Sequence, residues 1–230
     1  MPSGFRRSAG VRRISSRATR PPKVGPGTAG SKSFFIAERH REYSMQYGYR
    51  LANLDGKPAP NRYGVVIFLP DALEMLVRPI RERFDPDYSL ISGNLVLVAP
   101  FETELPLAEL SSVIAREVAA ITAPTIEFDH LGDSYPAYPL IYWEIRQNEV
   151  IDRLYKNLYT SLDLALPYRG YTPHVTVARE ISEHRVMLVK EKIYPYLPEE
   201  SFVPTAVDLV APIAGEAWVS VRTFPLRVEE

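Results

Sequence analysis

The chain has 230 residues, of which 46% are hydrophobic and 24% are charged, a composition typical of a globular protein that can bury a core. It has no cysteine, which excludes disulfides, Cys-ligated zinc, iron–sulfur clusters and thiol nucleophiles. No apolar run approaches the roughly 18 residues of a membrane span. We therefore expect a soluble, cytoplasmic protein without a membrane partner, whose imidazole chemistry comes from four histidines, His40, His130, His174 and His184.

The charge is unevenly distributed along the chain. Overall, 27 basic residues stand against 28 acidic ones, but residues 1–33 hold eight Lys or Arg and no acid, which leaves 19 basic against 28 acidic residues, or −9, for the remainder. Residues 1–33 have few large apolar side chains, so we expect a disordered basic tail. It could be a solvated tail, an arm that touches RNA or a membrane, or a transit peptide. Residues 34–62 are expected to form an N-terminal extension.

The first half of the remaining chain alternates strands and helices. An apolar, β-branched run predicts a buried strand at 63–69, and Asp71 is a candidate N-cap for a helix that reaches Phe84. A strand at 94–98, a helix over 107–118 led by Pro106, and a strand at 125–130 follow.

The second half repeats this order. A strand is predicted at 140–145, a helix over 150–162 capped by Asn148, and a strand at 174–178. A helix over 181–194 with Ser182 as its cap precedes two strands, 202–210 and 216–224, joined as a hairpin by a turn containing Gly215. Corresponding positions lie 77 to 80 residues apart, as in Asn94 and His174. The pattern predicts two β-α-β-α-β lobes, with one continuous sheet as the alternative.

One strand carries polar residues suited to chemistry. Along 174–178, His174 and Thr176 share one face, while Val175 and Val177 point to the other. An imidazole can move a proton near neutral pH, and a hydroxyl can donate to an anionic oxygen, so the pair suits a phosphate. Arg179 could add a guanidinium at the end of the strand. A structural His–Thr pair is the alternative interpretation.

The segment 173–179, Pro-His-Val-Thr-Val-Ala-Arg, resembles the second signature of the 2H phosphoesterase superfamily, in particular its bacterial 2′-5′ RNA ligase / RNA 2′,3′-cyclic phosphodiesterase branch. The repeat and the terminal segment 218–226 fit as well. The resemblance implies an α+β bilobal fold over residues 63–228, with lobes of about 63–135 and 136–228 whose antiparallel sheets face a central cleft. It implies general acid and base histidines, one per lobe, and neither metal nor cofactor.

The first signature departs from the family pattern. In the segment 90–101, Asn94 stands at the histidine position and Val96 at the threonine position. An amide cannot exchange a proton at useful pH, although it can donate a hydrogen bond, and valine cannot donate. Only His174 and Thr176 therefore carry over as catalytic residues, and Asn94 carries over as a neutral contact to the substrate.

Other side chains could contact the substrate. Tyr135, Tyr138, Tyr168 and Tyr171 could stack on a base, and Arg169 could pair with phosphate, although loop packing is the alternative for each. His130 could approach the cleft, whereas His184 and His40 are expected to be uninvolved.

The main hypothesis is a diverged, monomeric 2H phosphoesterase-like protein that binds, and weakly hydrolyses, a nucleotide or RNA terminus with a 2′,3′-cyclic or 2′-5′ phosphodiester. A non-catalytic nucleotide-binding or scaffold protein is the alternative.

Overall fold

The computed structural model describes residues 61–213 and 217–228. Strands and helices alternate through the first half, in the order β1 (Arg62–Phe68), α2 (Asp71–Phe84), β2 (Asn94–Glu102), α3 (Leu107–Ala119) and β3 (Phe128–Asp133). The second half contains β4 (Leu140–Ile145), α4 (Glu149–Ser161), β5 (His174–Arg179), the 3₁₀ turn η1 (Glu183–Arg185), α5 (Val186–Ile193), η2 (Tyr194–Tyr196), β6 (Ala206–Pro212) and β7 (Trp218–Pro225). The mixed α+β class is as predicted.

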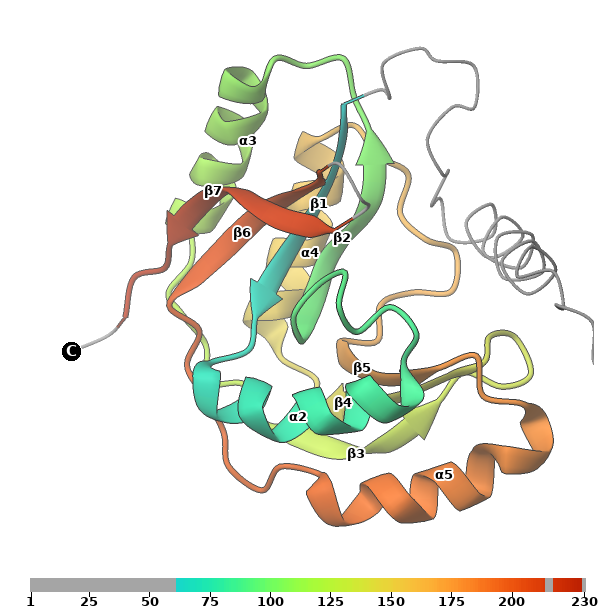
Figure 1. The fold of residues 1–230 in the computed structure, drawn as a ribbon. Coiled ribbons are helices and arrows are strands. Elements are labelled where there is room, and N and C mark those ends of the chain that lie inside the picture. Colours follow the sequence, from blue (N-terminus) through green and yellow to red (C-terminus); the bar gives the residue numbers. More distant parts are fainter. Residues whose placement is uncertain (1–60, 214–216, 229–230) are drawn as a thin grey trace, which may run out of the picture. The chain divides into compact units, whose positions relative to one another are not determined.

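The seven strands form one antiparallel sheet in the order β3-β4-β5-β2-β1-β6-β7. Only one residue pair, Leu95 with Val175, joins β2 to β5 at its centre. The sheet therefore has two halves, and the two predicted sheets are joined edge to edge. In Figure 1, α2 and α5 lie with β3, β4 and β5, while α3 and α4 lie with the other half.

The two sequence repeats exchange elements between these halves. β3 from the first repeat pairs with β4, and β6 from the second pairs with β1. In addition, α2 packs on β5, and α4 packs on β2. The predicted lobe boundary at about 135/136 falls between the paired strands β3 and β4, so strand pairing crosses it.

The internal repeat is visible in the strand register. In the β1–β2 pair, Val65 lies opposite Val98, and the next residue, Val66, lies opposite Val96. In the β4–β5 pair, Ile141 lies opposite Ala178, and Tyr142 lies opposite Thr176. The same irregularity thus occurs at positions 80 residues apart in β2 and β5. Such a bulge re-aims the side chains that follow it.

Helix starts follow local chemistry. The predicted cap of α4 is confirmed, because the Asn148 side chain accepts hydrogen bonds from the main-chain nitrogens of Val150 and Ile151. The predicted cap of α2 is wrong by one residue: Pro70 holds the extended cap conformation, and Asp71 is the first helical residue. In the first turn, its carboxylate still interacts favourably with the positive end of the helix dipole. Ser182 precedes η1 without a side-chain capping bond, and regular α-helix begins only at Val186.

Strands β3 and β6 begin later than the predicted strands at 125–130 and 202–210, and both differences have the same cause. Ile126 and Phe202 exchange main-chain hydrogen bonds of 2.8 and 3.0 Å as an isolated bridge. The residues before β3 and β6 therefore pair with each other before each chain segment joins the sheet. The hairpin of β6 and β7 is confirmed. The predicted turn at Gly215, the tail at 1–33 and most of the extension at 34–62 lie outside the described residues.

The core is built from alternate strand residues and one face of each helix. The buried set includes Leu95, Val175, Trp143, Leu154 and Ile114, each at most 1% exposed. Residues between them on the strands are half-buried, which defines a second face of the sheet. Within the described ranges, no helix combines the length and apolar character needed to cross a bilayer.

Candidate active site

Asn94, Val96, His174 and Thr176 lie around the single pair that joins the two half-sheets. Because Leu95 faces Val175 and both are buried, the residues on either side alternate to the opposite face. Asn94 then lies across from Thr176, and Val96 across from His174. We call this half-buried surface the site face. Its two motif positions are related by the repeat, as the sequence predicts.

The His174 ring is held in one orientation. Its Nδ1 lies 2.7 Å from the main-chain oxygen of Thr172, which can only accept, so Nδ1 donates the hydrogen bond. Nε2 of the neutral ring then carries the lone pair and can accept a proton. Burial lowers the pKa of His174 below 6.5, and the positive charge of Arg179 lowers it further against the opposing effect of the Thr172 bond. The residue is therefore a base at neutral pH.

Asn94 reproduces part of the His174 arrangement. Its Nδ2 donates to the main-chain oxygen of Ser92 at 2.7 Å, so each side chain bonds the carbonyl two residues earlier at the same distance. The amide therefore occupies the place of an imidazole and keeps its contact to the main chain. It lacks an atom corresponding to Nε2, which is the atom that would transfer a proton.

Tyr142 is part of the site face that sequence reasoning missed. It lies opposite Thr176 on β4, and its ring centroid is 4.7 Å from that of His174. Gly132, opposite Tyr142 on β3, makes room for the ring, because a Cβ at this position would overlap the Tyr142 side chain. Alternation along 140–145 indicates the face of Tyr142, but only the pairing of β4 with β5 brings it to His174.

Glu144 is the second residue that sequence reasoning missed. It lies opposite His174 on β4, and its carboxylate is 3.4 Å from Nε2 of His130, whose Nδ1 is 2.9 Å from Asp129. The structure thus brings His130 into the row that contains His174, with Glu144 between them. His184 lies on η1, where its Nε2 is 3.5 Å from the Ser182 hydroxyl. His40 lies outside the described residues.

Arg179 is held by carboxylates that follow α2. Its Nη1 donates to Asp87 at 3.3 Å, and its Nε is 3.6 Å from Asp85, whose side chain is fully buried and also accepts from Arg81 at 3.0 Å. A phosphate bound by Arg179 would therefore compete with two carboxylates. The positive charge of Arg179 still helps to lower the pKa of His174.

The other predicted substrate contacts are spread over two loops. The Arg169 guanidinium lies 5.3 Å from the ring centroids of both Tyr138 and Tyr168, and its Nε donates to the Tyr168 hydroxyl at 2.7 Å. Tyr135 is half-buried against the core, and burial followed by the charges of Asp133 and Glu183 raises its pKa. These contacts are compatible with loop packing, and Arg169 and Tyr168 are exposed.

Tyr171 has contacts of a different kind. Its hydroxyl donates to the main-chain oxygen of Val96 at 2.9 Å, and its ring stacks on Tyr155 of α4 at 4.0 Å and 7°. Burial raises the pKa of Tyr171, followed by the charge of Asp152 and the neighbouring tyrosines. The phenol is thus engaged with α4 and β2.

Across residues 61–213 and 217–228, no three His, Asp or Glu side chains are grouped so that they could hold a metal ion.

Comparison with known proteins identifies the family. Residues 69–216 match the model of the 2′-5′ RNA ligase superfamily, so this chain belongs to that superfamily, the 2H phosphoesterases. A Bacillus pumilus protein described as a "putative phosphoesterase" is 33% identical over 172 residues, which cover 73% of this chain and 99% of the relative. A Geobacillus kaustophilus protein with the same description is 31% identical over 71% of this chain and 95% of its own length.

Solved structures agree on the fold. Escherichia coli LigT complexed with 3′-AMP superposes with a TM-score of 0.51 at 18% identity, over 73% of this chain and 98% of LigT. The protein TT0787 of Thermus thermophilus gives a TM-score of 0.53 at 14% identity, over 74% of this chain and all of that one. The predicted 2H phosphoesterase-like fold is confirmed.

Proposed function

We propose that this protein binds a nucleotide or an RNA terminus carrying a 2′,3′-cyclic or 2′-5′ phosphodiester on the site face, and hydrolyses it weakly. One observation carries the proposal: Asn94 and His174 occupy equivalent places and hold the same main-chain contact at 2.7 Å, but only His174 retains a proton-transferring nitrogen. This supports a site that still binds phosphate and has lost one half of its acid–base pair.

In the proposed hydrolysis, His174, Thr176 and Asn94 each have a separate role. Nε2 of His174 takes a proton from water as the water oxygen attacks phosphorus, and one ring P–O bond of the cyclic phosphate breaks. The Thr176 hydroxyl donates to a non-bridging oxygen, and the Asn94 amide supplies a neutral contact. The leaving oxygen takes its proton from solvent, because no imidazole stands at position 94. Loss of one acid–base partner typically lowers a rate by about 10²–10⁴-fold.

The remaining predicted residues have smaller roles in this proposal. Arg179 contributes positive charge near the phosphate while it stays paired with Asp85 and Asp87. Arg169 and Tyr135 are proposed to contact the nucleoside part of the substrate. We further propose that the protein acts as a cytoplasmic monomer, which gel filtration and cell fractionation would test.

The alternative function is a non-catalytic nucleotide-binding or scaffold protein. It is favoured by Val96, which replaces a hydroxyl with an apolar group directly across from His174. On this alternative, the site face would bind a phosphate ester without turnover.

One set of variants tests both functions. The full chain, His174→Ala and Asn94→His/Val96→Thr are incubated with 2′,3′-cyclic nucleotides and an RNA ending in a 2′,3′-cyclic phosphate, with His184→Ala as the matched control. We expect weak wild-type turnover, its loss in His174→Ala, and a gain of about 10²-fold or more in the double variant.

The outcomes separate the hypotheses. Nucleotide binding without turnover in the wild type, together with turnover in the double variant, would favour the non-catalytic alternative. Turnover that survives His174→Ala would contradict the assignment of the site. If neither the wild type nor the double variant binds nucleotide, the proposed function is wrong.

A further inference from the structure

The two halves of the site are joined by very little main chain. Asn94 and Val96 belong to β2, and His174 and Thr176 belong to β5, yet these strands share only the pair Leu95–Val175. Other neighbouring strands in the sheet pair over three to seven residues. With one residue pair between β2 and β5, contacts outside the strand ladder also bear on the separation of the half-sites.

Tyr171 supplies such a contact. It lies three residues before His174, and its hydroxyl donates to the main-chain oxygen of Val96 at 2.9 Å. Val96 lies directly across from His174. The hydrogen bond therefore runs from the chain that leads into β5 to the residue of β2 that faces the catalytic imidazole, as a ladder bond would if the strands continued to pair.

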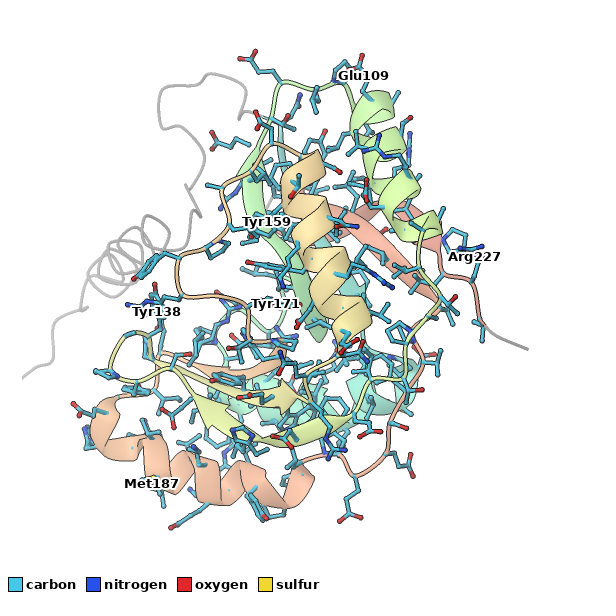
Figure 2. The ribbon with its side chains drawn as sticks, turned by 180° about the vertical axis from the view of Figure 1, so that it is seen from behind. Glu109, Tyr138, Tyr159, Tyr171, Met187 and Arg227 are labelled. Atoms are coloured by element: carbon cyan, nitrogen blue, oxygen red, sulfur yellow. The ribbon has the colours of Figure 1, made fainter. Side chains whose placement is uncertain are left out.

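Helix α4 gives this bond a rigid support. The Tyr171 ring stacks on Tyr155 with centroids 4.0 Å apart, and Tyr155 lies 4.8 Å from Tyr159. The Tyr159 hydroxyl accepts from the main-chain nitrogen of Ala99, again on β2, at 3.4 Å. Figure 2 shows Tyr159 and Tyr171 beside α4. The three tyrosines thus connect the segment that precedes β5 to α4 and β2, which belong to the other half of the sheet.

We propose that Tyr171 is a positioning residue that sets the separation of the two half-sites across the β2–β5 junction. This inference rests on the proposed function for its kinetic consequence, but its structural part does not. In this role the Tyr171 hydroxyl is engaged by the main-chain oxygen of Val96, and Tyr171 acts on the site through that residue. It matters most when both half-sites must reach one phosphate, as in the variant with a histidine restored at position 94.

A double-mutant comparison provides the kinetic test. The gain in kcat produced by Asn94→His/Val96→Thr is measured with Tyr171 and again with Tyr171→Phe, which keeps the ring and removes the hydroxyl. We expect the gain to fall from about 10²-fold or more to below about tenfold, with a smaller change in KM. The matched control is Tyr155→Phe, which removes a hydroxyl of the same cluster that does not bond Val96, and it should leave the gain intact.

A spectroscopic readout separates this inference from the proposed function. Nuclear Overhauser contacts between the His174 ring and the Val96 methyls should weaken in Tyr171→Phe and persist in Tyr155→Phe, whether or not the protein turns over any substrate. An unchanged gain or unchanged contacts in a folded Tyr171→Phe protein would overturn the positioning role. If the restored double variant shows no activity, the proposed function fails, while the contacts still decide the role of Tyr171.

Discussion

At the scale of single residues, the site depends on which nitrogen of an imidazole is available. The Thr172 carbonyl accepts a hydrogen bond from Nδ1–H of His174, so the lone pair of the neutral ring is on Nε2. Asn94 makes the corresponding bond to the main-chain oxygen of Ser92, but its side chain has no nitrogen at the place of Nε2. On the proposed function, this one difference leaves a general base at position 174 and removes its acid partner at position 94, although the main-chain contact is kept.

On the proposed function, the pH dependence of turnover should follow the protonation state of His174. Burial, together with the charge of Arg179, puts its pKa below 6.5, and the base must be neutral to accept a proton. Activity should be level at neutral pH and fall only below pH 6.5, reaching about tenfold per pH unit below the folded pKa. A pH–rate profile of the wild type, with His184→Ala as control, measures this. A midpoint above 6.5 would contradict the assignment.

At the scale of elements, aromatic contacts on the site face depend on neighbouring strands. Tyr142 of β4 reaches His174 because Gly132 of β3 leaves space beneath its ring. Glu144 lies in the next row along β4 and meets His130 of β3. The β3–β4 pair thus supplies the surroundings of a histidine carried by β5.

Gly132→Ala should disturb this arrangement. The added methyl would overlap the Tyr142 ring, so the free energy of unfolding should fall by about 1–3 kcal/mol in urea titrations. The cost should shrink in a Tyr142→Ala background, where the overlap is gone. Gly64→Ala on β1 is the matched control, since its Cβ would meet Val210 at an ordinary 3.4 Å. Equal costs for the two glycines would argue against a specific role of Gly132.

At the scale of the folded unit, the two repeats are interdependent. Each repeat contributes its third strand to the half of the sheet that holds the first strand of the other repeat. The helices are exchanged in the same way, because α2 of the first repeat packs on β5 and α4 of the second repeat packs on β2. Ion pairs support the exchange, since the buried carboxylate of Asp85 after α2 is paired with Arg81 of α2 and lies 3.6 Å from Arg179 on β5. Neither repeat forms a complete layer by itself.

This topology predicts a single cooperative unit over the described residues. Fragments 61–135 and 136–228 should each remain unfolded in isolation, because β3 loses its partner β4, and β6 loses β1. Circular dichroism and amide exchange on the separate and mixed fragments provide the measurement. A cooperatively folded isolated fragment would show that the repeats are independent after all.

The sequence by itself determined the strand and helix order, the Asn148 cap, the repeat, and the contrast in side-chain type between His174 and Thr176 on one side and Asn94 and Val96 on the other. Each of these depends on periodicity or on residue type within a short window, which local physics dictates. Only the tertiary structure decided that β3 and β6 cross between halves, that Tyr142 and Glu144 border His174, and that Tyr171 bonds Val96. Those features depend on which strands pair, and pairing between distant segments is set by burial of the whole core and by no local pattern.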